Sequence, residues 1–209
     1  MSATHSKLQQ GQDSRGRLVD SAAGLISAGG YAATSVDAIA KGAGVVKSAL
    51  YWHFGSKRGL LLAAIRSETA RWVQEAFGAA LDEGAPVGRL DQLIDSVQDV
   101  IVNGPRMHRL TLSLLLELGA EDDEVRQVVA DVFRVTREAL AAGLADSLPG
   151  LRPDAAEDIA EAFTAQFDGL LMRYIAEPDQ RRLDRSLRTL RRMMLLALEH
   201  ELNRGGTGS

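Results

Sequence analysis

Lys47 and Ser48 are the polar side chains whose type and position most suggest a chemistry, and they lie within residues 34–60, TSVDAIAKGAGVVKSALYWHFGSKRGL. Apolar residues such as Leu50 give the short helix predicted over 46–52 one buried side, which leaves Lys47 and Ser48 exposed near its amino-terminal end. An ammonium group and a hydroxyl there can donate hydrogen bonds to phosphate oxygens or to the edges of bases. The chemistry indicated is recognition of a polyanion rather than catalysis.

The distribution of charge supports a polyanionic partner. Residues 1–60 hold seven Lys and Arg side chains against three Asp, a net charge of +4, although the whole chain carries −4. All four lysines lie in this segment. A basic segment on an acidic protein favours binding to nucleic acid. Chance clustering of the basic residues is the alternative, which charge by itself leaves open.

A second short helix must precede this one and hold it in place. Thr34 is suited to cap a helix over 35–42, with Asp37 three residues later in a capping-box position. Gly44 supplies the left-handed conformation that a tight turn between helices favours. Two short helices joined by a three-residue turn containing glycine form a helix-turn-helix, in which the first helix braces and the second enters the major groove.

The remaining sequence predicts an all-α protein, because apolar residues recur at helical spacing and the alternation typical of strands is scarce. Nine helices fit the pattern, at about 14–28, 35–42, 46–52, 56–81, 89–102, 106–119, 122–147, 154–177 and 179–203. We expect a disordered polar tail over 1–13, a helix-turn-helix domain over 14–60, a larger helical domain over 61–204 and a second disordered tail over 205–209.

Composition and motifs exclude several classes of protein. The chain has no cysteine, which rules out disulfide frameworks, thiolate metal sites and a cysteine nucleophile. Its four histidines show no metal-ligand spacing, and it has no glycine-rich phosphate loop, nucleophile elbow or HExxH motif. The longest apolar run, 193–198, is far shorter than a membrane span, and the amino terminus lacks the apolar core of a signal peptide. We therefore expect a cytoplasmic protein that is not an enzyme and uses no cofactor or metal.

The motif around the second short helix resembles the DNA-binding domain of the TetR (tetracycline-repressor) family of transcriptional regulators. The resemblance extends from about residue 17 to residue 62 and rests on Ile39-Ala40, Ala43-Gly44-Val45, Leu50-Tyr51-Trp52-His53-Phe54 and Ser56-Lys57. The rest of the chain matches only in length and helical layout. The resemblance implies a homodimer in which each subunit joins a DNA-binding head to a helical body that binds a small-molecule effector and dimerises.

By the same resemblance, particular side chains are expected to contact double-stranded DNA. Tyr51 and His53 match a pair that contacts phosphate at the end of the recognition helix, and Lys57 matches a phosphate-binding lysine. For His53, a structural hydrogen bond between helices is the alternative. Ser35 begins the bracing helix, where free N–H groups favour a phosphate. The expected DNA-binding residues are Ser35, Lys47, Ser48, Ala49, Tyr51, Trp52, His53 and Lys57.

Two positions depart from the family pattern. Val46 stands where Ser or Thr commonly caps the recognition helix, and Ala49 stands where Thr is common. A missing cap costs about 0.5–2 kcal/mol unless another group replaces it. The missing hydroxyl at residue 49 leaves a small side chain that can pack on a thymine methyl group.

The body is expected to provide an effector site and a dimer interface. An apolar cavity with a few polar groups is the usual form of a small-molecule site. Its candidate residues, each with a place in the core as the alternative, are Trp72, Met107, Thr111, Leu114, Phe133, Phe163 and Phe167. The resemblance implies that the last two helices meet their mates in a four-helix bundle, for which the candidate residues are Asp168, Gly169, Leu187, Leu190 and Met194. Asp168 either pairs across that interface or faces the cavity.

These expectations combine into a ligand-responsive transcriptional repressor that binds a palindromic operator as a homodimer and is released by a small-molecule effector. A transcriptional activator, or a regulator without an effector, fits the same motif. A helical adaptor whose head binds protein is the alternative from another class. Salt-sensitive, sequence-selective binding to DNA separates these possibilities.

Overall fold

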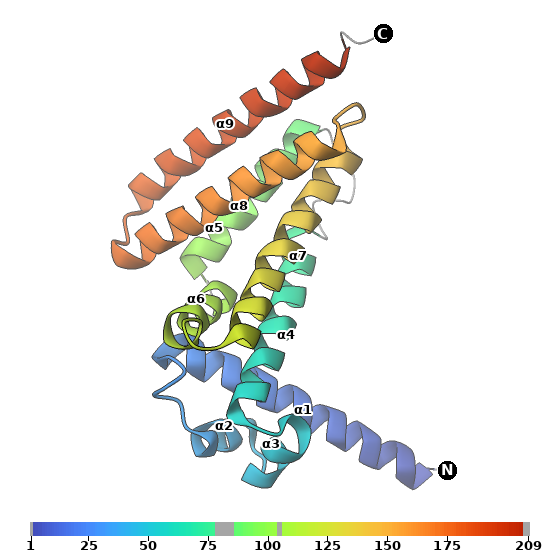
Figure 1. The fold of residues 1–209 in the computed structure, drawn as a ribbon, viewed down its shortest axis with the longest axis vertical. Helices are drawn as coiled ribbons and strands as arrows, with labels where there is room; N and C mark the ends of the chain where they lie inside the picture. The colour runs from blue at the N-terminus through green and yellow to red at the C-terminus, as the bar shows by residue number, and fades with distance from the viewer. Residues whose placement is uncertain (1, 78–85, 104–105, 207–209) are drawn as a thin grey trace. The chain divides into compact units, whose positions relative to one another are not determined.

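The computed structural model describes residues 2–77, 86–103 and 106–206, and these residues contain helices but no strand. The helices are α1 (Ser2–Gly29), α2 (Val36–Ala43), α3 (Lys47–Phe54), α4 (Lys57–Phe77), α5 (Pro86–Asn103), α6 (Arg106–Leu118), α7 (Asp123–Ser147), α8 (Pro153–Ala176) and α9 (Gln180–Gly206) (Figure 1). The predicted all-α class is confirmed.

The helix bounds differ from the predicted ones mainly at the two ends of the chain. α1 begins at Ser2, so residues 2–13, for which a disordered tail is predicted, are helical. Three glutamines, which favour helices, lie there, and a helix already anchored at its other end extends easily through such residues. α9 likewise continues to Gly206, within the second predicted tail. The predicted end of the fourth helix, at 81, lies outside the described residues.

Contacts divide the chain into two compact units. The first unit comprises Met1–Arg71 and Arg106–Val132, and the second comprises Trp72–Pro105 and Phe133–Ser209. The division does not fall at residue 60, because α6 packs against α1 and so joins the first unit. α4 and α7 are each divided between the two units, with their first-unit residues ending at Arg71 and Val132.

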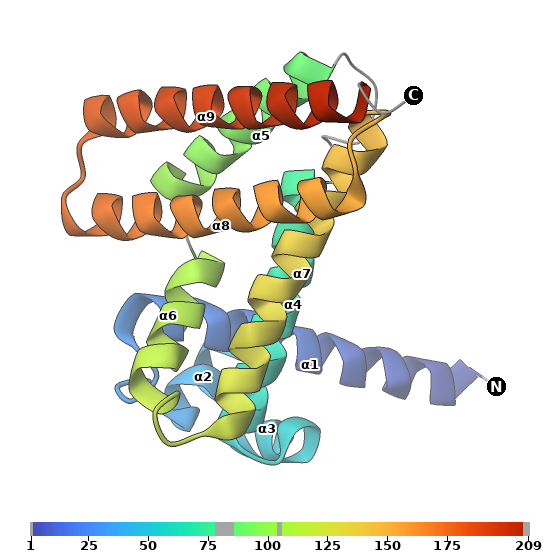
Figure 2. The same cartoon turned by 45° about the horizontal axis from the view of Figure 1, so that its top comes forward.

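The first unit is built around the three-helix arrangement that the sequence predicts. α1 packs on α2 and α3, and α2 packs on α3 (Figure 2). Leu18 of α1, Ile39 of α2 and Leu50 of α3 are completely buried. Each of these side chains belongs to the apolar face of its own short helix, and their burial holds α2 and α3 in a fixed relation to α1.

The second unit contains α5, α8 and α9, and α8 and α9 run side by side in opposite directions (Figure 2). Pro153 opens α8, where a missing N–H has no cost. The apolar side chains that recur every three or four residues along α9 face into this unit and are buried: Leu183, Leu187, Leu190, Met194 and Leu198. Among the described residues, no helix is long and apolar enough to cross a membrane.

Candidate nucleic-acid interface

The turn that leads into α2 is capped by Ser35 rather than by Thr34. The Ser35 hydroxyl accepts a hydrogen bond of 3.0 Å from the N–H of Ala38. Thr34 is buried, and its hydroxyl donates instead to the carbonyl of Gly30. The predicted Thr34 cap is therefore wrong by one residue, because the chain turns back after Gly30 and carries the Thr34 side chain inward.

The turn between α2 and α3 has the conformation expected of a helix-turn-helix. Gly44 adopts the left-handed conformation, with φ of 63°, in which a side chain would be strained. The N–H of Val45 donates to the carbonyl of Ala40, at 3.0 Å, and closes the end of α2. Asp37, predicted for a capping box, instead accepts a 3.0 Å hydrogen bond from the Lys47 ammonium. This exposed ion pair ties the first turn of α3 to α2 and raises the pKa of Lys47.

α3 is held by one buried side chain and exposes most of the others. Leu50 is its buried residue, whereas Val46, Tyr51 and Trp52 are 70%, 47% and 78% exposed. Val46 is the N-cap and makes no side-chain cap bond, as its departure from the family pattern predicts. Lys47 and Ser48 are exposed and Ala49 is half-buried, so the amino-terminal end of α3 presents small and basic side chains to a partner.

His53 makes a hydrogen bond between helices, which was its alternative role. Its Nε2 lies 2.9 Å from the hydroxyl of Ser14 on α1. Burial, together with the nearby Arg15 guanidinium, lowers the pKa of the His53 ring. Arg15 itself lies over the ring of Phe54, 5.3 Å from its centre. The carboxyl-terminal end of α3 is therefore fastened to α1.

Lys57, the expected phosphate-binding lysine, is engaged within the protein. Its ammonium donates to the carbonyl of Tyr31 and lies 4.0 Å from the centre of the Tyr31 ring. Burial lowers the pKa of Lys57, and the negative charge of Glu117 opposes this effect. A phosphate would have to share this ammonium with Tyr31 or draw it away.

Glu117 on α6 is the residue of this site that sequence reasoning missed. Its carboxylate accepts hydrogen bonds from the backbone N–H groups of Tyr31 and Ala32, at 2.9 and 2.7 Å, and from the Ser113 hydroxyl. The turn before α2 is thus held from α6. The only local signal is the spacing of Ser113 and Glu117, because Tyr31 lies 86 residues away in sequence.

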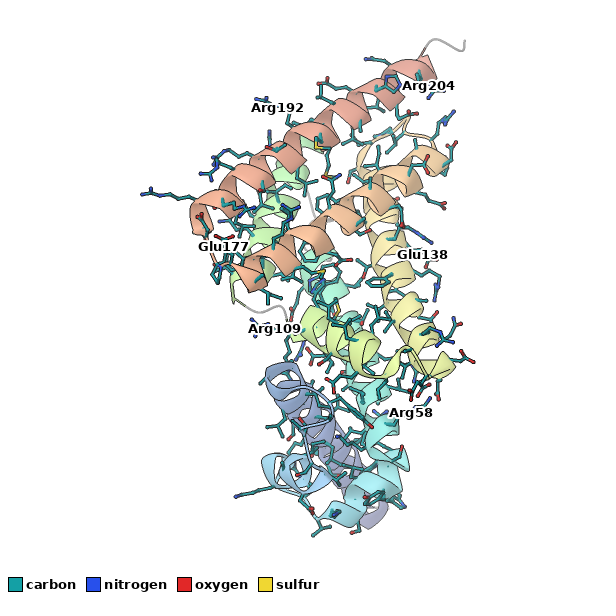
Figure 3. The ribbon with its side chains drawn as sticks, turned by 60° about the vertical axis from the view of Figure 1, so that its left-hand side comes forward. Arg58, Arg109, Glu138, Glu177, Arg192 and Arg204 are labelled. Atoms are coloured by element: carbon teal, nitrogen blue, oxygen red, sulfur yellow. The ribbon has the colours of Figure 1, made fainter. Side chains whose placement is uncertain are left out.

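A second set of charges joins the start of α4 to the turn between α6 and α7. The guanidinium of Arg58, which Figure 3 labels, donates to both carboxylate oxygens of Asp122, at 2.5 and 2.6 Å, and pairs with Glu124. Asp122 also accepts the N–H groups of Glu124 and Val125 and so caps α7. The sequence predicts a helix from about residue 122, and the structure adds the pairing of Asp122 and Glu124 with Arg58.

The expected effector residues are divided between the two units. Met107, Thr111 and Leu114 are buried in the first unit, where the Thr111 hydroxyl donates to the Met107 carbonyl within α6. In the second unit, Trp72 stacks on Phe167 with ring centres 6.3 Å apart, and Phe163 is also buried. Phe133 is 45% exposed, so the second unit does not enclose it.

The expected dimer residues differ in how far they are available to a partner. Leu187, Leu190 and Met194 are buried within one chain, because the periodic apolar face of α9 packs on its own unit. Gly169 is exposed, and a Cβ there would meet nothing within 4 Å. The exposed apolar side chains of α8 and α9 are instead Met172, Ile175, Met193 and Leu196.

The half-buried Asp168 has neither a hydrogen bond nor an ion pair among the described residues. Burial raises the pKa of this carboxyl to about 6. Its neighbour on α8 is Phe167, whose ring stacks on Trp72. The second unit thus places a carboxyl without a cationic partner next to a residue of an aromatic pair.

Comparison with known proteins identifies the two parts of the chain separately. Residues 18–64 match the family described as "Bacterial regulatory proteins, tetR family". Residues 86–198 match the family described as "BetI-type transcriptional repressor, C-terminal". The first match covers the helix-turn-helix, and the second covers more than half of the chain.

Individual relatives agree with these families. The chain is 30% identical to the HTH-type transcriptional regulator TtgR of Pseudomonas putida, over 82% of this chain and 84% of the relative. It is 33% identical to the HTH-type transcriptional regulator BetI of Rhizobium meliloti, over 76% of both. A transcriptional regulator from Saccharomonospora viridis, solved in complex with choline, matches in fold with a TM-score of 0.69 at 19% identity, over 90% of this chain and 97% of that one.

Proposed function

The chain belongs to the TetR family of bacterial regulatory proteins, a family of DNA-binding transcriptional regulators, and we propose that it is a repressor that binds a palindromic operator as a homodimer and leaves it when a small-molecule effector binds. The observation that carries the proposal is the exposed face of α3, which offers side chains to a partner while Leu50 is the one residue of the helix that is buried. In a dimer, two such helices would enter successive major grooves about 34–36 Å apart.

The DNA contacts follow from where each side chain lies. Ser48 and Ala49, which are small, let the start of α3 approach the base edges, and Ala49 suits a thymine methyl group. Tyr51 and Trp52 are exposed farther along the helix, where their side chains would contact the phosphates of the DNA backbone. Ser35, Lys47, His53 and Lys57 complete the interface. Lys47 and Lys57 already have partners in the free protein, so both would exchange or share them on binding.

The homodimer would form through α8 and α9. A groove of about 600 Å³ runs between these helices and is lined by Leu170, Leu190 and Met193 together with the guanidinium groups of Arg173 and Arg185. Exposed Met172, Met193 and Leu196 supply the apolar surface that a dimer interface requires. Met193→Lys is expected to give monomers in sedimentation analysis. Arg192→Glu, on the outward side of α9 (Figure 3), serves as the matched control.

The effector would bind in the second unit, and the chemistry there favours a cation. An organic ammonium ion is bound by carboxylates and by the faces of aromatic rings, and this unit holds both, in Asp168 and in the stacked rings of Trp72 and Phe167. The choline complex of the Saccharomonospora viridis regulator makes choline a sensible first compound to test. Release of DNA by an effector requires that it bind the DNA-free form more tightly than the DNA-bound form.

Selection from a random DNA library at near-physiological salt tests the proposal directly. Enrichment of a palindrome with half-sites about one helical turn apart is expected.

Lys57→Ala should weaken binding to all DNA sequences. It should also reduce, by about one, the slope of log affinity against log salt concentration. Tyr51→Phe keeps the ring and removes the hydroxyl, so any loss of affinity measures a phosphate contact. Featureless enrichment by folded protein would instead favour an adaptor that binds protein. Action on an operator places the protein in the cytoplasm.

A further inference from the structure

The hydrogen bond between Ser14 and His53 determines which ring nitrogen carries the proton. Ser14 Oγ lies 2.8 Å from the carbonyl of Gly11, to which it donates, and 2.9 Å from His53 Nε2. A serine hydroxyl has a single proton. We assign that proton to the Gly11 carbonyl, because two oxygens 2.8 Å apart repel each other without a proton between them, and Nε2 of the ring is then the donor to Ser14. The neutral ring then carries its proton on Nε2 and a lone pair on Nδ1.

This tautomer is unsuited to a phosphate. A phosphate oxygen accepts hydrogen bonds, and neutral His53 has already given its one N–H to Ser14. The imidazolium form is different, because it carries a second N–H at Nδ1. Only that form can keep its bond to Ser14 and donate to a phosphate at the same time.

The surroundings of His53 keep the ring neutral in the free protein. On α3 its neighbours are the rings of Trp52 and Phe54, with centres 4.4 and 5.9 Å away. On α1, Arg15 is the charged group among the described residues whose field reaches the ring. Burial and this positive charge both lower the pKa of His53 from its ordinary value of 6.5 and so favour the neutral ring in the free protein. A phosphate beside the ring would act in the opposite direction.

We propose that Ser14 is a positioning residue for His53 and that operator binding takes up one proton from solvent at His53 Nδ1, which then donates to a DNA phosphate while Nε2–H stays on Ser14. The inference rests on the proposed contact of His53 with DNA. It makes operator affinity rise as the pH falls toward the pKa of the free ring, below which the affinity levels off.

Proton uptake is measured by titrating the full-length protein with a selected operator duplex in a calorimeter, in phosphate and in Tris buffer. These buffers differ in ionisation enthalpy, so the difference in heat gives the number of protons bound. For the unmodified protein at pH 7 we expect an uptake approaching about one proton per chain. His53→Gln keeps an N–H donor but does not titrate, and it should remove that uptake. Equal uptake by the two proteins would overturn the inference.

Three substitutions of serine, two at Ser14 and one at Ser27, test the positioning role. Ser14→Ala frees the neutral ring to turn its N–H toward phosphate, so uptake should fall, whereas Ser14→Thr keeps the hydroxyl and should preserve it. Ser27→Ala is the matched control, since Ser27 also donates to a carbonyl three residues earlier, that of Gly24, but has no ring partner among the described residues. Uptake by Ser14→Ala equal to that of the unmodified protein would remove Ser14 from the mechanism.

The design separates this inference from the proposed function. If the unmodified protein binds operator with salt-dependent affinity but without proton uptake at His53, the DNA-binding proposal stands and the inference fails. If the protein selects no DNA sequence at all, both fail.

Discussion

Glu68 in the first unit and Asp168 in the second are both carboxylates withdrawn from solvent, but they differ in what surrounds them. Glu68 is 4% exposed and pairs with Arg71 and with Arg106, whose guanidinium nitrogen is 3.6 Å away. Asp168 is half-buried and has no such partner among the described residues. Burial of a carboxylate is unfavourable unless cations or N–H groups compensate it.

The two units therefore differ in the role of their carboxylates: those of the first unit stabilise the structure, whereas Asp168 of the second is available for function. In the first unit, Glu68, Glu117 and Asp122 each meet a partner on another helix or turn, which for Glu68 is Arg106 of α6. These contacts hold the framework that presents α3. In the second unit, no hydrogen bond or ion pair among the described residues compensates the burial of Asp168. This is typical of a carboxyl that interacts with a ligand or a partner subunit.

Acid should weaken the first unit through His108, which is the largest effect expected. Burial lowers the pKa of this α6 side chain from 6.5 to about 4. The unfolded chain therefore binds more protons between these values, so the stabilisation is complete above about pH 6.5 and is lost as the pH falls toward 4. We expect a loss of about 2 kcal/mol by pH 5. Urea unfolding at pH 7.5 and pH 5 measures this loss of the free energy of unfolding. An equal loss in the His108→Gln variant would show that other groups cause it.

Asp168→Asn should stabilise the protein at neutral pH. The folded pKa of about 6 lies above the ordinary value of 3.8, so the carboxyl favours folding at low pH and this contribution is lost as the pH rises through 6. After allowance for partial exposure, the variant should gain about 1–2 kcal/mol at pH 7.5 and nothing near pH 4. Asp158→Asn, an exposed acid on the same helix, is the control. A loss of stability at pH 7.5 would mean that Asp168 has a partner in the assembled protein.

Glu117→Gln tests the opposite case, a carboxylate that is compensated. Burial raises the pKa of Glu117, but the N–H groups of Ala32 and Tyr31 and the Ser113 hydroxyl outweigh it and lower the pKa overall. Replacing the charged acceptor should cost about 1 kcal/mol, because the bonds to two N–H groups weaken. Thermal unfolding measures this cost, with the exposed Glu121→Gln as the control variant. Equal stability of the two variants would show that the hydrogen bonds from Glu117 to the turn before α2 do not stabilise the protein.

Trp52→Ala should have the smallest effect on stability and a clear effect on DNA. The ring is 78% exposed, so unfolding should change by less than about 0.5 kcal/mol. Operator affinity should fall about tenfold if the ring flanks the DNA backbone, which corresponds to about 1.4 kcal/mol. A fluorescence titration with labelled operator measures the affinity. Unchanged affinity would exclude Trp52 from the interface.

The predictable parts of this protein are those that depend on neighbours in sequence. Leu50 is buried and Gly44 is left-handed as expected, because helical periodicity and the special conformation of glycine act within a few residues. The same local reasoning fails by one residue at Thr34, where the fold turns a suitable capping side chain inward. It also finds the apolar stripe of α9, but cannot tell whether Leu187 packs within the chain or against another copy.

By itself, the sequence determined the all-α class, the place of the helix-turn-helix and the basic character of its segment, since periodicity, turn residues and charge are short-range properties. Tertiary structure alone decided which groups meet: Ser14 with His53, Glu117 with the N–H groups of Tyr31 and Ala32, and Lys57 with the Tyr31 ring. These partners lie between 26 and 86 residues apart, and only the packing of α1, α3, α4 and α6 brings them into contact. The same packing leaves Asp168 half-buried without a cation, which no local pattern predicts.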